Sequence, residues 1–390
     1  MKAGLKTMAL TLLAAAGTVL AGPNTLRADD FSATVVAGHP PVFRWVKMIP
    51  EVFVPTVQKE LEGSGHSVTF DLQAGGAIAK VGEELEAVGE GLAEMGTVQA
   101  LFDPAKLAVQ NVTYYTPFVS SDVNQISNMM DRLHKEDPRL QQAYTDNNIV
   151  YLGAPIGIDD YLLMTNFPVN SLDDLKGRKI AAPGAALNWL SGTGAVGVSG
   201  NLTTYYNELK TGVYDGVIVF ASAAVPGKLY EVAPNVTRMG LGAQFAGVLG
   251  ANKDWYESLP DEVRAALHTG ADAAKDWYNN DLTSFAAKAL EIMAANGATV
   301  KEAPEEMRKA WAMGMDNAAK TWLLISTARV SRALKSFPFT WRKCARLAPR
   351  RCAIGTRSSA PWRVTRLAMS RPPAGALPFR CLTASPCFSM

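Results

Sequence analysis

The chain has 390 residues, of which 48% are hydrophobic, enough for two globular lobes with sizeable cores. Its formal charge of +2 conceals two unlike segments, because residues 323–390 hold 13 of the 38 basic residues and none of the 36 acidic ones. Residues 1–322 therefore carry 25 basic and 36 acidic residues, a formal charge of −11. Beyond the N-terminal segment we find no run of about 18 apolar residues, so we expect a soluble mature protein.

The N-terminus has the pattern of a secretory signal peptide. Lys2 and Lys6 precede an apolar run from Met8 to Leu20, and small-residue cleavage sites end at Ala21 and Ala28. A single-helix membrane anchor is the alternative, but the run is short for a bilayer span. We expect residues 1–28 to be a signal peptide and the protein to be exported to the periplasm.

The basic tail, residues 323–390, does not resemble the protein before it. It is rich in Arg, Ser and Pro and lacks lasting periodicity. One interpretation is a nucleic-acid or membrane-binding arm whose cysteines form disulfides or bind metal, although the wide spacings argue against zinc. We favour a frameshift near Leu323, which predicts a non-functional, disordered tail. It contains all four cysteines of the chain, Cys344, Cys352, Cys381 and Cys387.

The first part of the mature chain alternates strands and helices. Strands are expected at 31–37, 68–72 and 92–98. Helices are expected at 42–62, kinked or broken by Pro50 and Pro55, and at 79–89. This order predicts a parallel sheet, in which ligands bind outside the carboxyl ends of the strands. The rule marks the candidate site loops at His39, Gly75, Gly76 and 99–102.

The middle and end of the chain continue with both element types. A helix starting after Pro183-Gly184 would direct its first N–H groups at the crevice. A long amphipathic helix starts at Pro260 and runs towards Met293, far enough to cross both lobes. The further elements expected are helices at 105–110, 125–146 and 184–194, and strands at 149–154, 161–165, 179–182 and 217–221.

Two motifs at a set separation carry a family resemblance. Residues 170–184 read NSLDDLKGRKIAAPG, and residues 205–219 read YYNELKTGVYDGVIV, with LPDEVRAAL at 259–267. Together with the signal peptide, this pattern resembles the extracytoplasmic solute receptors of TRAP transporters, the DctP-type family, over residues 30–322.

The resemblance implies an α/β, two-lobed periplasmic-binding-protein fold, class II-like, with a long helix bridging the lobes. Lobe I would comprise 29–152 and about 241–280, and lobe II 153–240 and about 281–322. A monomer would capture a small organic solute, an organic acid or related compound, and deliver it to the TRAP membrane subunits. It would need no cofactor, metal or nucleic acid.

One departure from the family pattern concerns the ligand anchor. The resemblance places a carboxylate-binding arginine where this chain has Ala181, and a second arginine of some relatives where it has Phe167. Alanine cannot replace the paired, charge-assisted hold of a guanidinium. Either the ligand lacks a carboxylate, or another cation holds it, or the receptor is degenerate. The candidate substitute cations are Arg44, Lys80 and His39.

Further candidate contacts each have a structural alternative. His39 could donate into the cleft or be a turn residue in solvent. Trp189 could be an apolar platform, though an aromatic on an amphipathic helix is more often core. Asp215 is interpreted as a turn residue. The remaining candidates, with packing or strand core as the alternative, are Gln99, Phe102, Val219 and Phe220.

Catalytic motifs do not stand out. Ser199-Gly200 lacks a G-x-S-x-G elbow, and His39, His66, His134 and His268 form no H-E-x-x-H pair. We therefore predict a binding protein rather than an enzyme. A secreted enzyme and a ligand receptor for a sensor kinase remain the alternatives on a similar scaffold.

Overall fold

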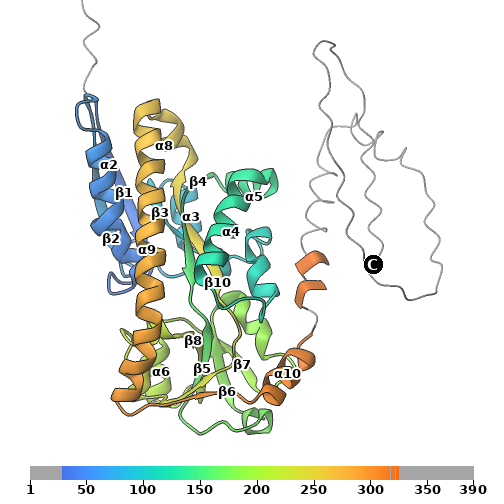
Figure 1. Ribbon diagram of the computed structural model, residues 1–390. Coiled ribbons are helices and arrows are strands. Elements are labelled where there is room, and N and C mark those ends of the chain that lie inside the picture. The colour runs from blue at the N-terminus through green and yellow to red at the C-terminus, as the bar shows by residue number, and fades with distance from the viewer. Residues whose placement is uncertain (1–28, 317, 321, 325–390) are drawn as a thin grey trace, which may run out of the picture. The chain divides into compact units, whose positions relative to one another are not determined.

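The computed structural model describes residues 29–316, 318–320 and 322–324 (Figure 1). The predicted signal peptide and residues 325–390 of the predicted out-of-frame tail lie outside the described residues. The described residues form two β-sheets with helices packed on both, which confirms the predicted two-lobed α/β class. Within this part of the chain, no helix is both long enough and apolar enough to cross a membrane.

The first sheet has the strand order β2-β1-β3-β10-β4. Strand β1 pairs in parallel with β2 and β3, as predicted from the alternation of strands and helices, whereas β10 runs antiparallel between β3 and β4. The strands are β1 (Asp29–Ala37), β2 (His66–Ala74), β3 (Met95–Val98), β4 (Ile149–Ile158) and β10 (Gln244–Asn252).

The helical connection after β1 is continuous but changes type at the prolines. Helix α1 (Arg44–Met48) passes into a π-helical segment (Ile49–Phe53), which passes into α2 (Val54–Glu60). Pro50 and Pro55 lack the backbone N–H that would continue the hydrogen bonding of the preceding segment, and each lies at the start of a segment where the helix type changes. The predicted kink is thus a change of helix type within one connection.

Three helix predictions in the first lobe needed correction. The helix expected at 79–89 is confined to α3 (Glu84–Gly89), after a run of turns. The helix expected at 105–110 is wrong, because that stretch consists of turns leading into 3-10 helix η3 (Val109–Tyr115).

The helix expected at 125–146 is two helices, α4 (Val123–Glu136) and α5 (Pro138–Thr145). Asp137 separates them, because its carboxylate caps α5 by accepting a hydrogen bond from the Arg139 backbone N–H at 2.9 Å. Proline at the first position of α5 cannot continue the hydrogen bonding of α4.

The second sheet has the strand order β11-β9-β5-β8-β6-β7. Strand β6 is parallel to β7 and β8, and β5 is antiparallel to β8 and β9. The predicted strands 161–165 and 179–182 are confirmed, and that at 217–221 is shifted by one residue. The strands are β5 (Tyr161–Thr165), β6 (Lys179–Ala182), β7 (Val196–Ser199), β8 (Gly216–Phe220), β9 (Asn235–Arg238) and β11 (Thr299–Glu302).

Short helices connect these strands. The α-helix expected at 184–194 is a 3-10 helix, η5 (Gly184–Leu190). The backbone N–H groups predicted to face the crevice therefore lie at the start of a 3-10 helix, which is shorter than the expected α-helix and more tightly wound. The other helical elements are η2 (Ala100–Phe102), η4 (Leu172–Leu175), α6 (Tyr205–Lys210), α7 (Ala221–Ala224), η6 (Leu229–Glu231), α8 (Lys253–Ser258) and α10 (Glu305–Gly314).

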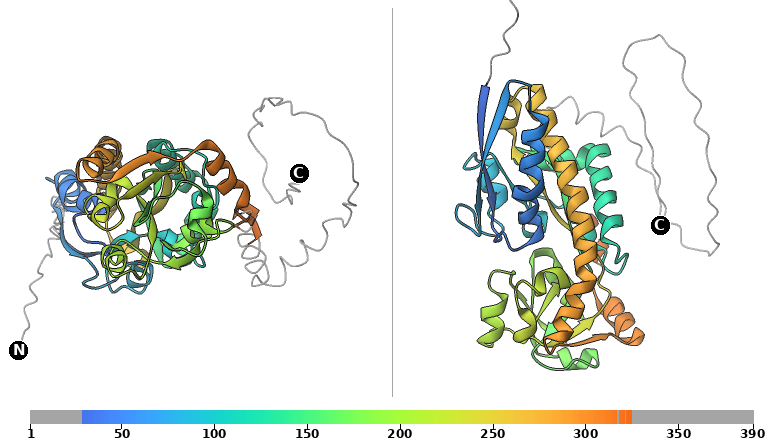
Figure 2. Two further views of the ribbon diagram at one scale, coloured as in Figure 1. Left: turned by 90° about the horizontal axis from the view of Figure 1, so that it is seen from below. Right: turned by 60° about the vertical axis from the view of Figure 1, so that its left-hand side comes forward.

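Helix α9 (Asp261–Ala295) has 35 residues and runs beside both sheets, as predicted (Figures 1 and 2). Its N-terminal half packs on β4 and α2, and its C-terminal end leads into β11 of the second sheet. The chain also passes from β4 to β5 at Asp159 and Asp160, so α9 and this crossing both connect the lobes.

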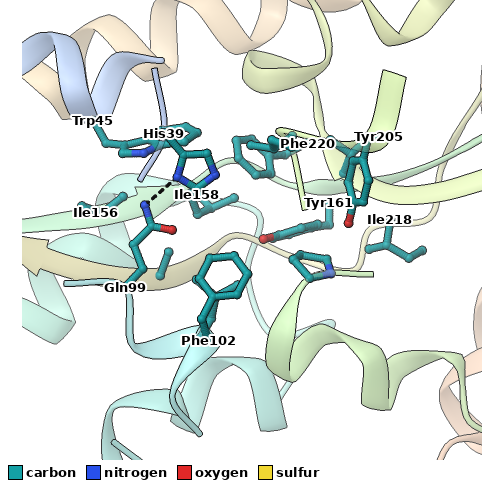
Figure 3. A pocket seen from close by; sticks show the side chains of 15 residues that line it. His39, Trp45, Gln99, Phe102, Ile156, Ile158, Tyr161, Tyr205, Ile218 and Phe220 are labelled. Carbon is teal, nitrogen blue, oxygen red and sulfur yellow. Dashed lines mark hydrogen bonds between the residues drawn. The ribbon is translucent and has the colours of Figure 1, made fainter. Parts of the chain in front are cut away.

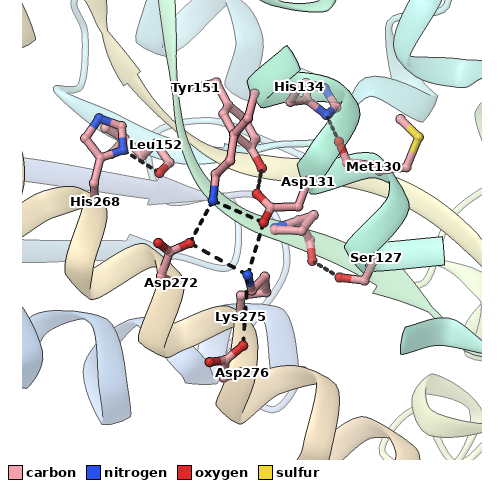
Figure 4. Close-up of polar contacts among 12 residues, drawn as sticks. Ser127, Met130, Asp131, His134, Tyr151, Leu152, His268, Asp272, Lys275 and Asp276 are labelled. Atoms are coloured by element: carbon pink, nitrogen blue, oxygen red, sulfur yellow. Dashed lines mark hydrogen bonds and ion pairs between the residues drawn. The ribbon is translucent and has the colours of Figure 1, made fainter. Parts of the chain in front are cut away.

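A polar cluster fixes α9 to α4 and β4 (Figure 4). The carboxylate of Asp131 accepts hydrogen bonds from the Tyr151 hydroxyl at 2.6 Å, Lys275 Nζ at 3.0 Å and Lys135 Nζ at 3.2 Å. Burial alone would raise the pKa of Asp131, but these hydrogen bonds outweigh it and lower the pKa. The cluster therefore anchors α9 to the first lobe while Asp131 is ionised.

Candidate functional site

A pocket with buried walls lies between the two sheets, and the space between its lining atoms amounts to about 390 Å³ when the part open to solvent is included (Figure 3). The side chains leave only a narrow central space. A solute bound here must therefore be small or must push the lobes slightly apart. From the first lobe the lining includes His39, Trp45, Gln99, Phe102, Ile156 and Ile158. From the second it includes Tyr161, Pro183, Tyr205, Ile218, Val219 and Phe220.

The position of the pocket follows from the sheet topology. His39 follows β1, and Gln99 follows β3, two parallel strands that end at the same edge of the first sheet. Pro183 follows β6 and Phe220 ends β8, which are parallel in the second sheet. The carboxyl ends of strands from both sheets thus face one space, as expected for ligand sites in open α/β sheets.

His39 and Gln99 form a hydrogen-bonded pair on the first-lobe side. The amide nitrogen of Gln99 donates to His39 Nδ1 at 3.2 Å, which leaves the imidazole proton on Nε2. Phe43 and Trp45 meet the imidazole edge-on, with centroids 5.5 and 5.2 Å away. Burial lowers the pKa of His39 to about 3, so the ring is neutral and is not a substitute cation.

The loop that carries His39 is held by a buried carboxyl group. Glu84 accepts hydrogen bonds from the backbone N–H groups of Gly38 at 3.0 Å and Gly82 at 2.7 Å. A Cβ at Gly38 would lie 2.6 Å from the Val81 Cα, so only glycine permits this approach. Burial raises the pKa of Glu84 to about 7. Glu84 was not predicted as a site residue, since nothing in its sequence context marks it as buried.

The second-lobe wall is aromatic and is supported from behind. The Tyr161 hydroxyl is hydrogen-bonded to that of Tyr114 at 2.9 Å. Trp189 stacks on Tyr114 with centroids 5.6 Å apart, and its indole N–H donates to the Tyr114 carbonyl at 2.7 Å. The structure therefore places Trp189 in the core behind Tyr161, outside the pocket lining.

Tyr205 contributes a buried hydroxyl to the same wall. The residue is 1% exposed, and its hydroxyl has no hydrogen-bond partner among the described residues. A Cβ built on Gly200 would lie 2.7 Å from the Tyr205 ring and 3.3 Å from the Ala181 Cβ. The Tyr205 ring and the methyl group of Ala181 therefore flank the same glycine. Neither Tyr205 nor Tyr161 was among the predicted site residues.

The two other candidate cations, Arg44 and Lys80, are not among the lining residues. The Arg44 guanidinium lies 2.5 Å from the Asp281 carboxylate and 3.5 Å from the ring centroid of Phe285, so α9 engages it. Lys80 is exposed in the turns before α3. None of the lining side chains in the described part of the chain is an Asp, Glu, Lys or Arg.

Among the other predicted positions, the structure brings Gln99, Phe102, Val219 and Phe220 together with His39 in the lining. Ala181 is buried in β6 beside the wall and does not line the pocket. Phe167 follows β5 at the strand end opposite Tyr161, with the Arg178 guanidinium 4.3 Å from its ring centroid. Asp215 accepts a hydrogen bond from the Lys179 backbone N–H at 2.8 Å, in keeping with a turn residue.

Polar and backbone contacts also join the lobes near the pocket. The buried carboxylate of Asp159, at the crossing from β4 to β5, accepts hydrogen bonds from Ser222 Oγ at 2.5 Å and Ser222 N at 3.2 Å. Gly184 of the second lobe approaches the first lobe so closely that a Cβ there would lie 2.8 Å from the Leu101 carbonyl carbon. The lobes are therefore in contact in this structure.

Chemically, the pocket offers neutral hydrogen-bonding groups in an aromatic enclosure. No group of three or more potential metal ligands occurs within residues 29–324 as far as they are described. The arrangement suits binding of a small organic molecule between two bodies.

Comparison with known proteins agrees with this geometry. A solute-binding protein of Sulfitobacter sp. strain NAS-14.1 is 30% identical over 288 residues, covering 70% of this chain and 84% of the relative. The ectoine-binding periplasmic protein TeaA of Halomonas elongata is 25% identical over 186 residues, covering 47% of this chain and 54% of the relative.

Among solved structures, a Bordetella pertussis extracytoplasmic solute receptor that binds pyroglutamic acid is similar in fold. Its TM-score is 0.67 at 17% identity, with 76% of this chain and 96% of that chain covered. The model of the DctP family matches residues 46–323, ending where the predicted out-of-frame tail begins. The chain belongs to the DctP family, bacterial extracellular solute-binding proteins of family 7.

Proposed function

We propose that this solute-binding protein captures a small organic solute in the pocket between its lobes and delivers it to the membrane subunits of a TRAP transporter. The observation that carries the proposal is a buried pocket whose walls come from both lobes at the carboxyl ends of their strands. The ectoine and pyroglutamic acid of the two relatives named above are solutes of this small size.

The proposed mechanism is hinged closure. Lobe I consists of the first sheet with its helices, lobe II of the second sheet with its helices, and the hinge includes the crossing at Asp159. A solute that contacts His39 and Gln99 on one side and Tyr205 on the other binds the closed form better than the open form. Only such a difference in affinity can shift the equilibrium towards closure. The contact between Gly184 and Leu101 would be made in the closed form alone.

The receptor would act in the periplasm as a monomer and release its solute unchanged. Membrane subunits would recognise the closed form, in which both lobes present one continuous surface. The buried side chains of the pocket supply no nucleophile paired with a base among the described residues. Catalysis is therefore not part of the proposal.

A closure experiment tests this function. The full chain is titrated with candidate solutes while the melting temperature and the radius of gyration in small-angle scattering are followed. We expect one class of solute to raise the melting temperature and reduce the radius of gyration, and to be recovered intact by chromatography. Conversion of the bound compound into a product would instead support an enzyme, and binding without compaction would contradict hinged closure.

A further inference from the structure

The charge balance around the pocket limits what it can hold. Every lining side chain of the described chain is uncharged, and the imidazole of His39 is neutral. A carboxylate or an ammonium group transferred from water into such a site keeps its charge only if a partner charge or several hydrogen bonds replace its hydration. The guanidinium of Arg44 is already paired with Asp281 outside the lining.

A buried carboxylate beside the pocket adds to the penalty for an anion. Asp159 lies in sequence between Ile158 and Tyr161, two lining residues, and is 5% exposed. Its hydrogen-bond partner is Ser222, through both the hydroxyl and the backbone N–H, and no basic side chain is paired with it among the described residues. Burial raises the pKa of Asp159 to about 6, so the carboxyl group is ionised at pH 7.5 and its negative charge repels an anion. Because Asp159 is not among the lining residues, a cation in the pocket does not form a direct ion pair with it.

The polar atoms of the pocket favour uncharged hydrogen-bonding groups. The Tyr205 hydroxyl is buried and has no partner in the described part of the protein. Figure 3 shows it on the side of the ring that faces Tyr161 and Ile218. The indole N–H of Trp45, from the opposite lobe, is likewise buried without a described partner. A carbonyl or hydroxyl group of a ligand satisfies such donors without bringing in a charge.

The remaining surface is aromatic. Trp45 and Phe220 approach each other across the lobes with centroids 6.0 Å apart, and Tyr161 meets Phe220 edge-on at 5.2 Å. Phe102 completes the enclosure from the first lobe (Figure 3). Such walls bury a flat ring by offset or edge-on contact.

We propose that the solute of this receptor is an uncharged ring compound with a carbonyl or hydroxyl group, and that the Tyr205 hydroxyl of lobe II is the hydrogen-bonding group that selects it. This inference rests on the proposed solute-binding function and specifies the ligand class of the same pocket. It assigns Tyr205 as a specificity-determining residue.

The test compares small ring compounds that carry a negative charge, no charge or a positive charge. One series is benzoate, benzamide and benzylamine, and the other is pyroglutamate, 2-pyrrolidinone and pyrrolidine, each titrated into the full chain by calorimetry at pH 7.5. We expect binding by the uncharged member of at least one series, at least tenfold tighter than by its charged counterparts.

Tighter binding of an acid or an amine than of the amide would overturn the inference while leaving the receptor function standing. No binding by any member of either series would count against solute capture in this pocket, and so against the proposed function itself.

Two variants isolate the hydroxyl of Tyr205. Tyr205→Phe should weaken binding of the uncharged probe about tenfold, equivalent to about 1.4 kcal/mol. It should leave the melting temperature without ligand unchanged or raised, because it removes a buried hydroxyl that has no described partner.

Tyr144→Phe is the matched control, since the Tyr144 hydroxyl is also buried without a described partner but lies outside the pocket lining. It should leave binding unchanged. Unaltered affinity in Tyr205→Phe, or equal losses in both variants, would refute the role of Tyr205.

Discussion

Closure of the lobes around Gly184 can be tested by adding a single methyl group. In Gly184→Ala the new Cβ would lie 2.8 Å from the Leu101 carbonyl carbon, closer still to its oxygen, and 3.4 Å from the Phe102 Cα. These atoms belong to the backbone of the opposite lobe and cannot rotate away. The overlap exists only when the lobes meet, so the substitution penalises the closed form.

The expected magnitude follows from the two costs involved. A methyl group forced into a packed contact costs about 1–3 kcal/mol, and alanine at the φ of +45° found at Gly184 costs about 1–2 kcal/mol more. The second cost applies to open and closed forms alike. Only the cost of the forced contact changes the equilibrium between open and closed forms. A penalty of about 2 kcal/mol on the closed form weakens solute binding about 30-fold.

Gly177→Ala is the matched control for the backbone cost. Gly177 has a φ of +72°, and a Cβ there would meet nothing within 4 Å. Both variants should lose similar stability in urea denaturation, but only Gly184→Ala should lose affinity for 2-pyrrolidinone and show a larger radius of gyration in scattering. Equal affinities for the two variants would refute the assignment of the Gly184 contact to lobe closure.

Three further substitutions test other parts of the account. Arg44→Ala should lower the free energy of unfolding by about 1–2 kcal/mol, because the ion pair with Asp281 and the contact with Phe285 are lost. Its affinity for the uncharged probes in calorimetry should equal that of the control variant Lys80→Ala. Weaker binding by Arg44→Ala would make Arg44 a ligand contact. Because the pKa of Glu84 is raised, the folded state binds more protons than the unfolded state from about pH 4.5 to 7. The contribution of this group to stability therefore falls as pH rises through that window, by up to about 3 kcal/mol. Urea denaturation at pH 5 and pH 8 should show a smaller loss of stability in Glu84→Gln than in the unaltered protein, and identical losses would contradict the raised pKa of Glu84. Ala181→Arg should destabilise the protein by about 3 kcal/mol or more, because it buries an unpaired charge against Tyr205. The double variant, Ala181→Arg with Tyr205→Ala, should recover stability and bind pyroglutamate. A stable single variant that binds pyroglutamate would argue against the packing of Ala181 beside Tyr205.

The elements predicted best from the sequence are those with a clear local pattern. The strands at 161–165 and 179–182 are short apolar runs bounded by turn residues, and the structure has the same bounds. Local pattern failed where a cap or packing decided the outcome. The break at Asp137 depends on a side-chain cap that competes with the continuation of α4.

For the pocket, the sequence was informative about strand ends and uninformative about side chains that arrive from elsewhere. His39 and Gln99 follow parallel strands, and the structure brings both into the lining. In the sequence, Tyr205 looks like an ordinary residue of an amphipathic helix and Tyr161 like an ordinary strand residue. Only the packing of the two lobes brings both into one pocket. Arg44 was a candidate cation because its partner, Asp281 of α9, is remote in sequence and could not be paired with it beforehand.

Native mass spectrometry of the full chain can show directly whether the pocket holds one small uncharged solute. The protein is purified from its cells without denaturation, weighed intact, and then unfolded so that any bound compound is released and identified. We expect one compound per chain, uncharged at pH 7 and bound at lower occupancy by Tyr205→Phe prepared in the same way. An organic acid bound equally by both proteins would contradict an uncharged ligand. If the intact protein carries no bound compound, even after incubation with the uncharged probes, solute capture in this pocket would be contradicted.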